Sequence, residues 1–85
     1  MKSFVYTVKD PVGIHARPAG LLAKKAKEYA SEIVLVKGER EANATRLMAV
    51  MGLCLKCGES VTVRITGEDE ECAAAELERF FGEHF

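Results

Sequence analysis

The apolar residues of this chain recur with two different periods, and the order in which these periods follow one another limits the fold most. Residues 61–65 alternate apolar and polar side chains, which is the two-residue period of a strand with one buried face. Residues 4–8 alternate in the same way. An apolar run at 33–36 predicts a further strand, which turns through Gly38 into a weaker strand at 40–43.

Between these strands the apolar residues recur at helical spacing. A helix is predicted over residues 16–29, because five apolar residues share one face there: Ala19, Leu22, Ala23, Ala26 and Ala30. A short helix is predicted around residues 47–51, and Gly58 lies beyond its end. The acidic cluster at 68–71 suits the positive end of a last helix. The buried face of that helix is expected to contain Ala73, Leu77, Phe80 and Phe81.

The order of the predicted elements is β-α-β-β-α-β-α, in a chain of 85 residues. Adjacent strands together with separated helices indicate the α+β class, with one antiparallel or mixed sheet and helices on one face. This length suits a single domain over residues 1–85 and excludes a TIM barrel or a dinucleotide-binding fold. The topology hosts many functions, so the function has to come from particular residues.

Charge and composition exclude several classes of partner. The formal net charge is −1, which gives no overall positive field for nucleic acid or membranes. No apolar run of about 18 residues could span a bilayer, and no signal peptide is visible. The three cysteines are an odd number, which fits a reducing compartment better than a disulfide scaffold. We therefore expect a cytoplasmic protein with no nucleic-acid partner and no insertion into membranes.

The segment Gly13-Ile14-His15-Ala16-Arg17-Pro18-Ala19 lies where the first strand gives way to the first helix. Pro18 has no N–H and a fixed φ, so it belongs in the first turn of a helix. His15 is then at or beside the N-cap, and the amides of Ala16 and Arg17 lack partners within the helix. Free amides, the helix dipole and a guanidinium group together form a binding site for an anion such as phosphate.

An imidazole beside such a site can act as a nucleophile, because a large neutral fraction of histidine persists near neutral pH. A phosphoryl group on a ring nitrogen of His15 would have its oxygens met by the two amides and by Arg17. The residue pattern also leaves a plainer alternative open, in which His15 is a surface residue or a poor helix cap.

The run Gly-Ile-His-Ala-Arg-Pro-Ala closely resembles the active-centre signature of the HPr family, the histidine-containing phosphocarriers of the bacterial sugar phosphotransferase system. The chain length, the place of His15 and the segment at 48–53 agree with this family. The resemblance implies an open-faced β-sandwich, in which four antiparallel strands carry three helices on one side. It also implies that Nδ1 of His15 receives phosphate from phosphorylated enzyme I and passes it to sugar-specific IIA domains, with Arg17 as the active-centre arginine. Such a carrier is not a stand-alone enzyme, needs no cofactor and is expected to be a monomer.

In the family, the exposed part of the first helix and the short second helix flank the histidine and bind the partners. The resemblance places this docking surface on Ala16, Gly20, Leu21, Lys24, Lys27, Leu47, Met48 and Met51. Flexible thioethers suit a surface that repacks against unlike partners, and the lysines can steer acidic partner surfaces. Some apolar residues of the second helix must instead face the core, and Met51 is open to either place.

Arg46 departs from the pattern of many family members from low-GC Gram-positive bacteria. Those relatives carry at this position a serine that a dedicated kinase phosphorylates. The chain has an arginine there, so no regulatory residue is predicted, and nothing indicates that neighbouring Thr45 replaces the serine.

The remaining candidates are Cys54 and Cys57, which have the C-x-x-C spacing, together with Cys72 and His84. Two such thiolates could hold zinc or cycle as a redox pair, but a tetrahedral zinc site needs two further ligands. The pair also follows a short helix, whereas a thioredoxin-like motif follows a strand and opens a helix. We therefore expect no metal site, Cys54 and Cys72 as small buried residues, and His84 exposed and without a role.

Two alternatives to a carrier in sugar uptake stay open. One is a regulatory phosphorelay protein of the same fold, of the nitrogen type, whose histidine signals to partners outside transport. The other is a metal or redox domain built on the C-x-x-C pair. The enzyme I that phosphorylates the chain distinguishes the first alternative, and the mass of the native protein tests the second.

Overall fold

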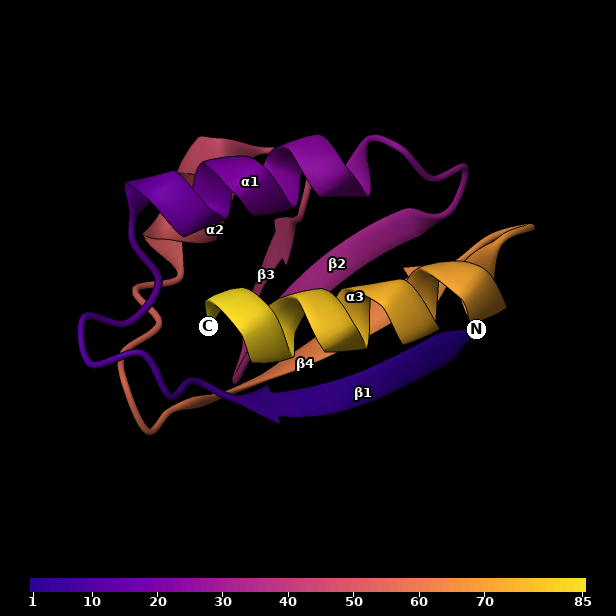
Figure 1. Ribbon diagram of the computed structural model, residues 1–85. Helices are drawn as coiled ribbons and strands as arrows, with labels where there is room; N and C mark the ends of the chain where they lie inside the picture. Colours follow the sequence, from indigo (N-terminus) through magenta and orange to yellow (C-terminus); the bar gives the residue numbers. More distant parts are fainter.

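A four-stranded antiparallel sheet forms the base of the structure, a computed structural model that describes residues 1–85. Its strands are β1 (Lys2–Thr7), β2 (Glu32–Lys37), β3 (Arg40–Asn43) and β4 (Ser60–Thr66). The helices are α1 (Ala16–Ala26), α2 (Leu47–Gly52) and α3 (Glu70–His84). The strands lie in the order β1-β4-β2-β3, so β4 sits between the first and second strands of the chain (Figure 1). The predicted element order and the α+β class are confirmed.

Alternation along β4 decides which face of the sheet is covered. Its inward-facing side chains are at most 1% exposed: Val61, Val63 and Ile65. Thr62 and Arg64, which alternate with them, point to the other face and are partly exposed. Val63 lies opposite Phe4 of β1 and Leu35 of β2, so the inward positions of three strands are in register. A shift of one residue would turn this whole apolar set toward solvent.

The helices supply the other half of the core. Leu22 of α1 and Phe81 of α3 are fully buried. The ring of Phe81 meets those of Phe4 and Tyr6 edge-on, with centroids 5.8 and 5.5 Å apart, which is a favourable aromatic geometry. Figure 1 shows α3 running across β1 and β4, with α1 and α2 side by side above it. None of the helices is both long and apolar enough to cross a membrane.

Helix α1 is shorter than the predicted helix over 16–29. It ends at Ala26, and after the helical bond from Lys27 to Ala23 the amides of Glu28 and Tyr29 reach carbonyls only three residues back, as in a turn. The amides of Ala30 and Ser31 then donate to the carboxylate of Asp69, each at 2.9 Å. The prediction that Ala30 lies on the buried face is therefore wrong, because this contact draws the chain out of the helix and leaves Ala30 exposed.

The acidic cluster at 68–71 does more than complement the start of α3. Asp69 occupies the N-cap position but makes no side-chain cap bond, since its carboxylate binds the loop after α1. Glu70 accepts a hydrogen bond from the amide of Gly67 at 3.1 Å and pairs with the ammonium group of Met1 at 2.8 Å. These acids tie the start of α3 to two other parts of the chain, which the composition of the cluster did not indicate.

Glu76 of α3 accepts bonds from three donors, of which Lys25 lies in α1, Tyr29 in the turn after α1 and Cys72 in α3 itself. Its carboxylate accepts hydrogen bonds from the Cys72 thiol at 3.0 Å, the Tyr29 hydroxyl at 2.7 Å and the Lys25 ammonium at 3.3 Å. These bonds lower the pKa of Glu76 to about 2, and the bond from Cys72 has the largest effect. Burial and the bond to Glu76 raise the pKa of Tyr29 to about 12. The same carboxylate raises the pKa of the Cys72 thiol.

All three cysteines are exposed, so the prediction that Cys54 and Cys72 are buried is wrong. In the segment around Cys54, Leu53 and Leu55 occupy the buried positions at 2% and 3% exposure. Cys72 lies on the outer side of α3, where its thiol reaches the carboxylate of Glu76. Cys72 is therefore a surface group, although cysteine is usually counted with the apolar residues.

The substitution Glu76→Gln should reduce the loss of folding stability that the protein suffers at acidic pH. A carboxylate with a lowered pKa in the folded state stabilises that state above its ordinary pKa of 4.5, and this contribution is lost as the pH falls toward about 2. Urea unfolding across this range should therefore show a smaller loss of unfolding free energy in Glu76→Gln than in the wild type. Glu78→Gln, an exposed change on the same helix, should keep the wild-type dependence. Identical losses at acidic pH in all three proteins would contradict the assignment.

Cys72 should react slowly with iodoacetamide at about pH 8, because the carboxylate of Glu76 raises the pKa of its thiol and leaves less thiolate. Brief labelling of the native protein followed by peptide mass spectrometry measures the reaction at Cys72 and at Cys54. Glu76→Gln should speed the labelling of Cys72 and leave that of Cys54 unchanged. A Cys72 rate that does not respond to Glu76→Gln would show that the carboxylate does not control this thiol.

Candidate active site

The loop between β1 and α1, residues 8–15, is held against the segment that precedes β4. The amide of Ile14 donates to the carbonyl of Leu55 at 3.0 Å, and the side chain of Ile14 is buried in the core. Gly13 has a φ of +82°, and a Cβ there would lie 2.5 Å from the Leu55 carbonyl oxygen. Only glycine fits this conformation and this close approach. The backbone that leads into His15 is therefore fixed by the segment around Leu55.

His15 is the N-cap of α1, as predicted. Its backbone is extended, with φ −123° and ψ 176°, and its carbonyl accepts the amide of Ala19 at 3.0 Å. Its side chain makes no cap bond, and Pro18 has no N–H to offer. The amides of Ala16 and Arg17 are left without partners in the chain. The positive end of α1 is therefore open beside the imidazole.

A carboxylate faces one nitrogen of the imidazole. Asp10 Oδ1 accepts the amide of Val12 at 2.9 Å, which fixes the side chain of Asp10. Its Oδ2 then lies 3.8 Å from Nε2 of His15. At this distance the carboxylate acts electrostatically and favours the tautomer with the proton on Nε2. Nδ1 is left with the lone pair that a nucleophile needs.

The imidazole lies in an open pocket of about 280 Å³. The loop before α1, the start of α1 and the last turn of α3 supply its walls: Asp10, His15, Arg17, Pro18, Leu21, Glu83 and His84. Arg17 is exposed and forms no salt bridge, so its guanidinium group is free to bind an anion. The only other hollow lies on the open face of the sheet, beside Glu32 and Arg64, and contains no histidine or cysteine.

His84 belongs to this pocket, which the sequence did not indicate. The expectation that it is exposed is wrong, because its ring is half-buried with its centroid 4.4 Å from that of Phe80. The carbonyl of Phe85 accepts the amides of Lys9 and Asp10 at 2.7 and 2.9 Å, which holds the end of α3 against the loop before α1. This contact joins segments that are far apart in the sequence, so no local sequence signal could have revealed it.

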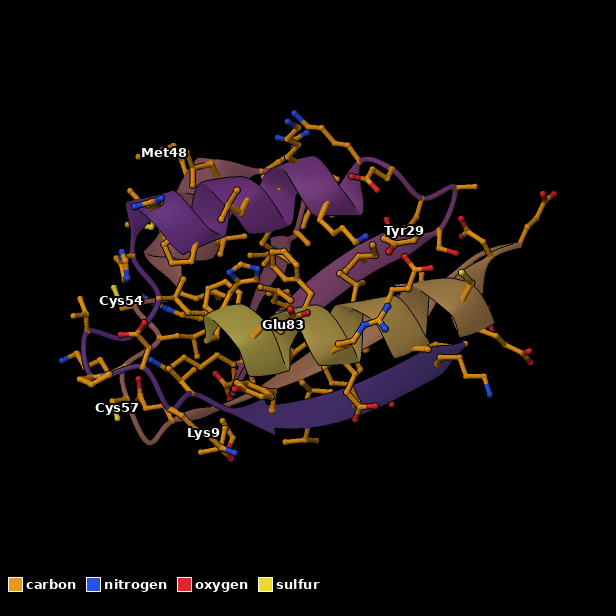
Figure 2. The ribbon with its side chains drawn as sticks, in the orientation of Figure 1. Lys9, Tyr29, Met48, Cys54, Cys57 and Glu83 are labelled. Carbon is orange, nitrogen blue, oxygen red and sulfur yellow. The ribbon has the colours of Figure 1, made fainter.

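Helices α1 and α2 present most of the predicted docking residues to solvent. Leu21, Leu47 and Met48 are 42%, 37% and 79% exposed, and Figure 2 shows Met48 at the outer edge of the pair of helices. Met51 is half-buried against the core, whereas Val50 is buried. Other predicted docking residues are exposed, or half-buried in the case of the glycine: Ala16, Gly20, Lys24 and Lys27. Helices α1 and α2 therefore expose both apolar and basic side chains.

Cys54 and Cys57 lie in the segment between α2 and β4 and point outward (Figure 2). Cys54 has a φ of +52°, the left-handed conformation of a residue that follows a helix end. The thiol of Cys57 lies 3.7 Å from the carbonyl oxygen of Lys9. No group of three or more His, Cys, Asp or Glu side chains in the chain is arranged to hold a metal ion. The pair flanks the site without entering its pocket.

Comparisons with known proteins agree with this geometry. The sequence model of a family described as "PTS HPr component phosphorylation site" matches residues 2–83. The phosphocarrier protein HPr of Lysinibacillus sphaericus is 48% identical over 73 residues, which cover 86% of this chain and 83% of that protein. A solved Mycoplasma histidine-containing phosphocarrier protein superposes with a TM-score of 0.89 at 33% identity, covering 93% and 90% of the two chains.

A second solved structure, HPr from Thermoanaerobacter tengcongensis, superposes over the full length of both chains with a TM-score of 0.87 at 35% identity. The predicted open-faced sandwich of four strands and three helices is thus the fold of solved HPr proteins. The family match spans nearly the whole chain and includes the His15 segment. This chain belongs to the HPr family, the phosphocarrier proteins of the phosphotransferase system.

Proposed function

We propose that this chain carries phosphoryl groups on His15 from phosphorylated enzyme I to sugar-specific IIA domains in the cytoplasm. One observation carries the proposal. The imidazole stands at the N-cap of α1, beside the free amides of Ala16 and Arg17 and an unpaired guanidinium group. This arrangement suits a nucleophile whose product is an anion.

The transfer uses the lone pair of Nδ1. As Nδ1 attacks the phosphorus, the Nδ1–P bond forms and the bond from phosphorus to the donor atom breaks, so the electron pair leaves with the donor. The amides at the start of α1 and the fork of Arg17 meet the phosphoryl oxygens as charge builds on them. The His15 side chain is 43% exposed, so a donor and later an acceptor can approach it directly.

The docking surface that we propose combines the exposed apolar residues with a basic rim. Leu21 and Met48 give an apolar centre next to the site, and Lys24 and Lys27 are exposed beside it. Arg46 is exposed at the N-cap of α2 and makes no side-chain cap bond. A fixed positive charge therefore occupies the place of the regulatory serine of some relatives, and it favours acidic partner surfaces.

His15→Ala should abolish phosphorylation by enzyme I and leave the fold intact, because this side chain is exposed and makes no cap bond. The assay follows transfer from phosphoenolpyruvate, with circular dichroism as the check on folding. Sugar-type and nitrogen-type enzyme I should be offered side by side, and the sugar type should be the faster donor. A labelled His15→Ala protein, or faster labelling by the nitrogen type, would overturn the proposal.

Arg17→Ala should slow transfer by about tenfold or more, a loss of about 1.4 kcal/mol of barrier stabilisation. Arg17→Lys should recover only part of the rate, because a single ammonium group lacks the bidentate fork. Single-turnover transfer from phosphorylated enzyme I measures both variants. Arg79→Ala serves as a control, since it removes an exposed positive charge outside both the pocket and the proposed docking surface. Wild-type rates in both Arg17 variants would remove this residue from the mechanism.

A further inference from the structure

The last turn of α3 forms one wall of the His15 pocket, and contacts near the end of the chain hold it there. The carbonyl of Phe85 takes the amides of Lys9 and Asp10, and its side chain is 4% exposed. The ring of Phe85 lies with its centroid 5.0 Å from that of Phe81 in the core. The two α3 residues that line the pocket are thereby held beside the loop that contains His15 (Figure 2 labels Glu83).

The two sides of this pocket differ in charge. On the α1 side, the helix N-terminus and Arg17 attract a phosphoryl group, which carries a charge of about −1.5 to −2. On the other side are the carboxylates of Asp10 and Glu83 and the negative C-terminal end of α3. The charged or titratable groups around this pocket are therefore Asp10, His15, Arg17, Glu83 and His84, of which only His84 can be a cation on the α3 side.

The imidazole of His84 is held in place but makes no polar contact. Its ring lies against Phe80 with centroids 4.4 Å apart and an angle of 40° between the planes. Neither ring nitrogen forms a hydrogen bond or a salt bridge within the chain, and no buried polar atom is left unsatisfied, so the ring nitrogens are open to the pocket or to solvent. Its N–H groups are therefore free to donate to an anion.

We propose that His84 is a second cationic contact for the phosphoryl group on His15, and that Glu83 opposes it. This inference rests on the proposed function, because it needs the phosphoryl group to be on His15. Protonated His84 stabilises the charge that grows on the phosphoryl oxygens from the α3 side of the pocket. Glu83, next to it on the same turn, weakens this attraction.

Phosphoramidate tests the proposal without any partner protein. Nδ1 of His15 attacks its phosphorus, the P–N bond to the leaving nitrogen breaks, and ammonia departs. The rate of formation of phosphohistidine is followed by phosphorus NMR at about pH 6 and about pH 8.5, because the lower pH favours the cationic form of an imidazole. Each variant is compared with the wild type at the same pH.

Four substitutions separate charge from packing. His84→Phe keeps the contact with Phe80 and should slow the reaction about two- to fivefold at the lower pH, the range of one exposed charge, with no effect at the higher pH. His84→Lys keeps the charge without the ring and should match the wild type at the lower pH and exceed it at the higher. Glu83→Gln should speed the reaction, and Glu78→Gln, outside the pocket, should not change it.

Different results would overturn the role of His84 and the proposed function of His15. Wild-type rates in His84→Phe at the lower pH, or equal losses in His84→Phe and His84→Lys, would overturn the role of His84. The His15→Gln protein gives the background from reaction at other histidines. If it reacts as fast as the wild type, His15 is not the acceptor and the proposed function itself fails.

Discussion

The inward face of β4 is the constraint on which both the core and the site depend. Val63 lies between Phe4 and Leu35 in register, so this strand holds β1 on one side and β2 on the other. The segment before β4 also supplies the Leu55 carbonyl that holds Ile14. β1, which pairs with β4, leads into the loop that contains His15, and the segment before β4 holds the other end of that loop. The position of the imidazole is therefore a consequence of sheet register as much as of the helix that follows it.

The parts of the site that the sequence predicts are those governed by local covalent chemistry. Pro18 lacks an N–H and has a fixed φ, which is enough to place His15 at the N-cap of α1 and leave the amide of Arg17 free. The alternation at 61–65 likewise shows its buried face without any knowledge of its neighbours. In both cases the cause lies within a few residues of its effect, so the local sequence is enough to predict the structure there.

The parts that sequence reasoning missed depend on contacts between distant segments. The bond between Asp69 and Ala30 shortens α1, and the bonds from Lys9 and Asp10 to Phe85 bring His84 to the pocket. No periodicity encodes which loop a carboxylate or a terminal carbonyl will meet. The prediction that two cysteines are buried is wrong for a different reason. Cysteine is only weakly apolar, and neighbouring leucines take the buried positions around Cys54.

The charge division of the pocket follows from a requirement of carrier chemistry. A carrier must accept a phosphoryl group and then release it, so a site built only of cations would hold the phosphorylated state too firmly and slow the second transfer. In this pocket the helix N-terminus and Arg17 are offset by Asp10 and Glu83. The imidazole is also 43% exposed, which keeps these interactions weak in water. With His15 as the nucleophile that we propose, opposed charges around an open imidazole favour transfer in both directions, which a closed and strongly positive pocket would not.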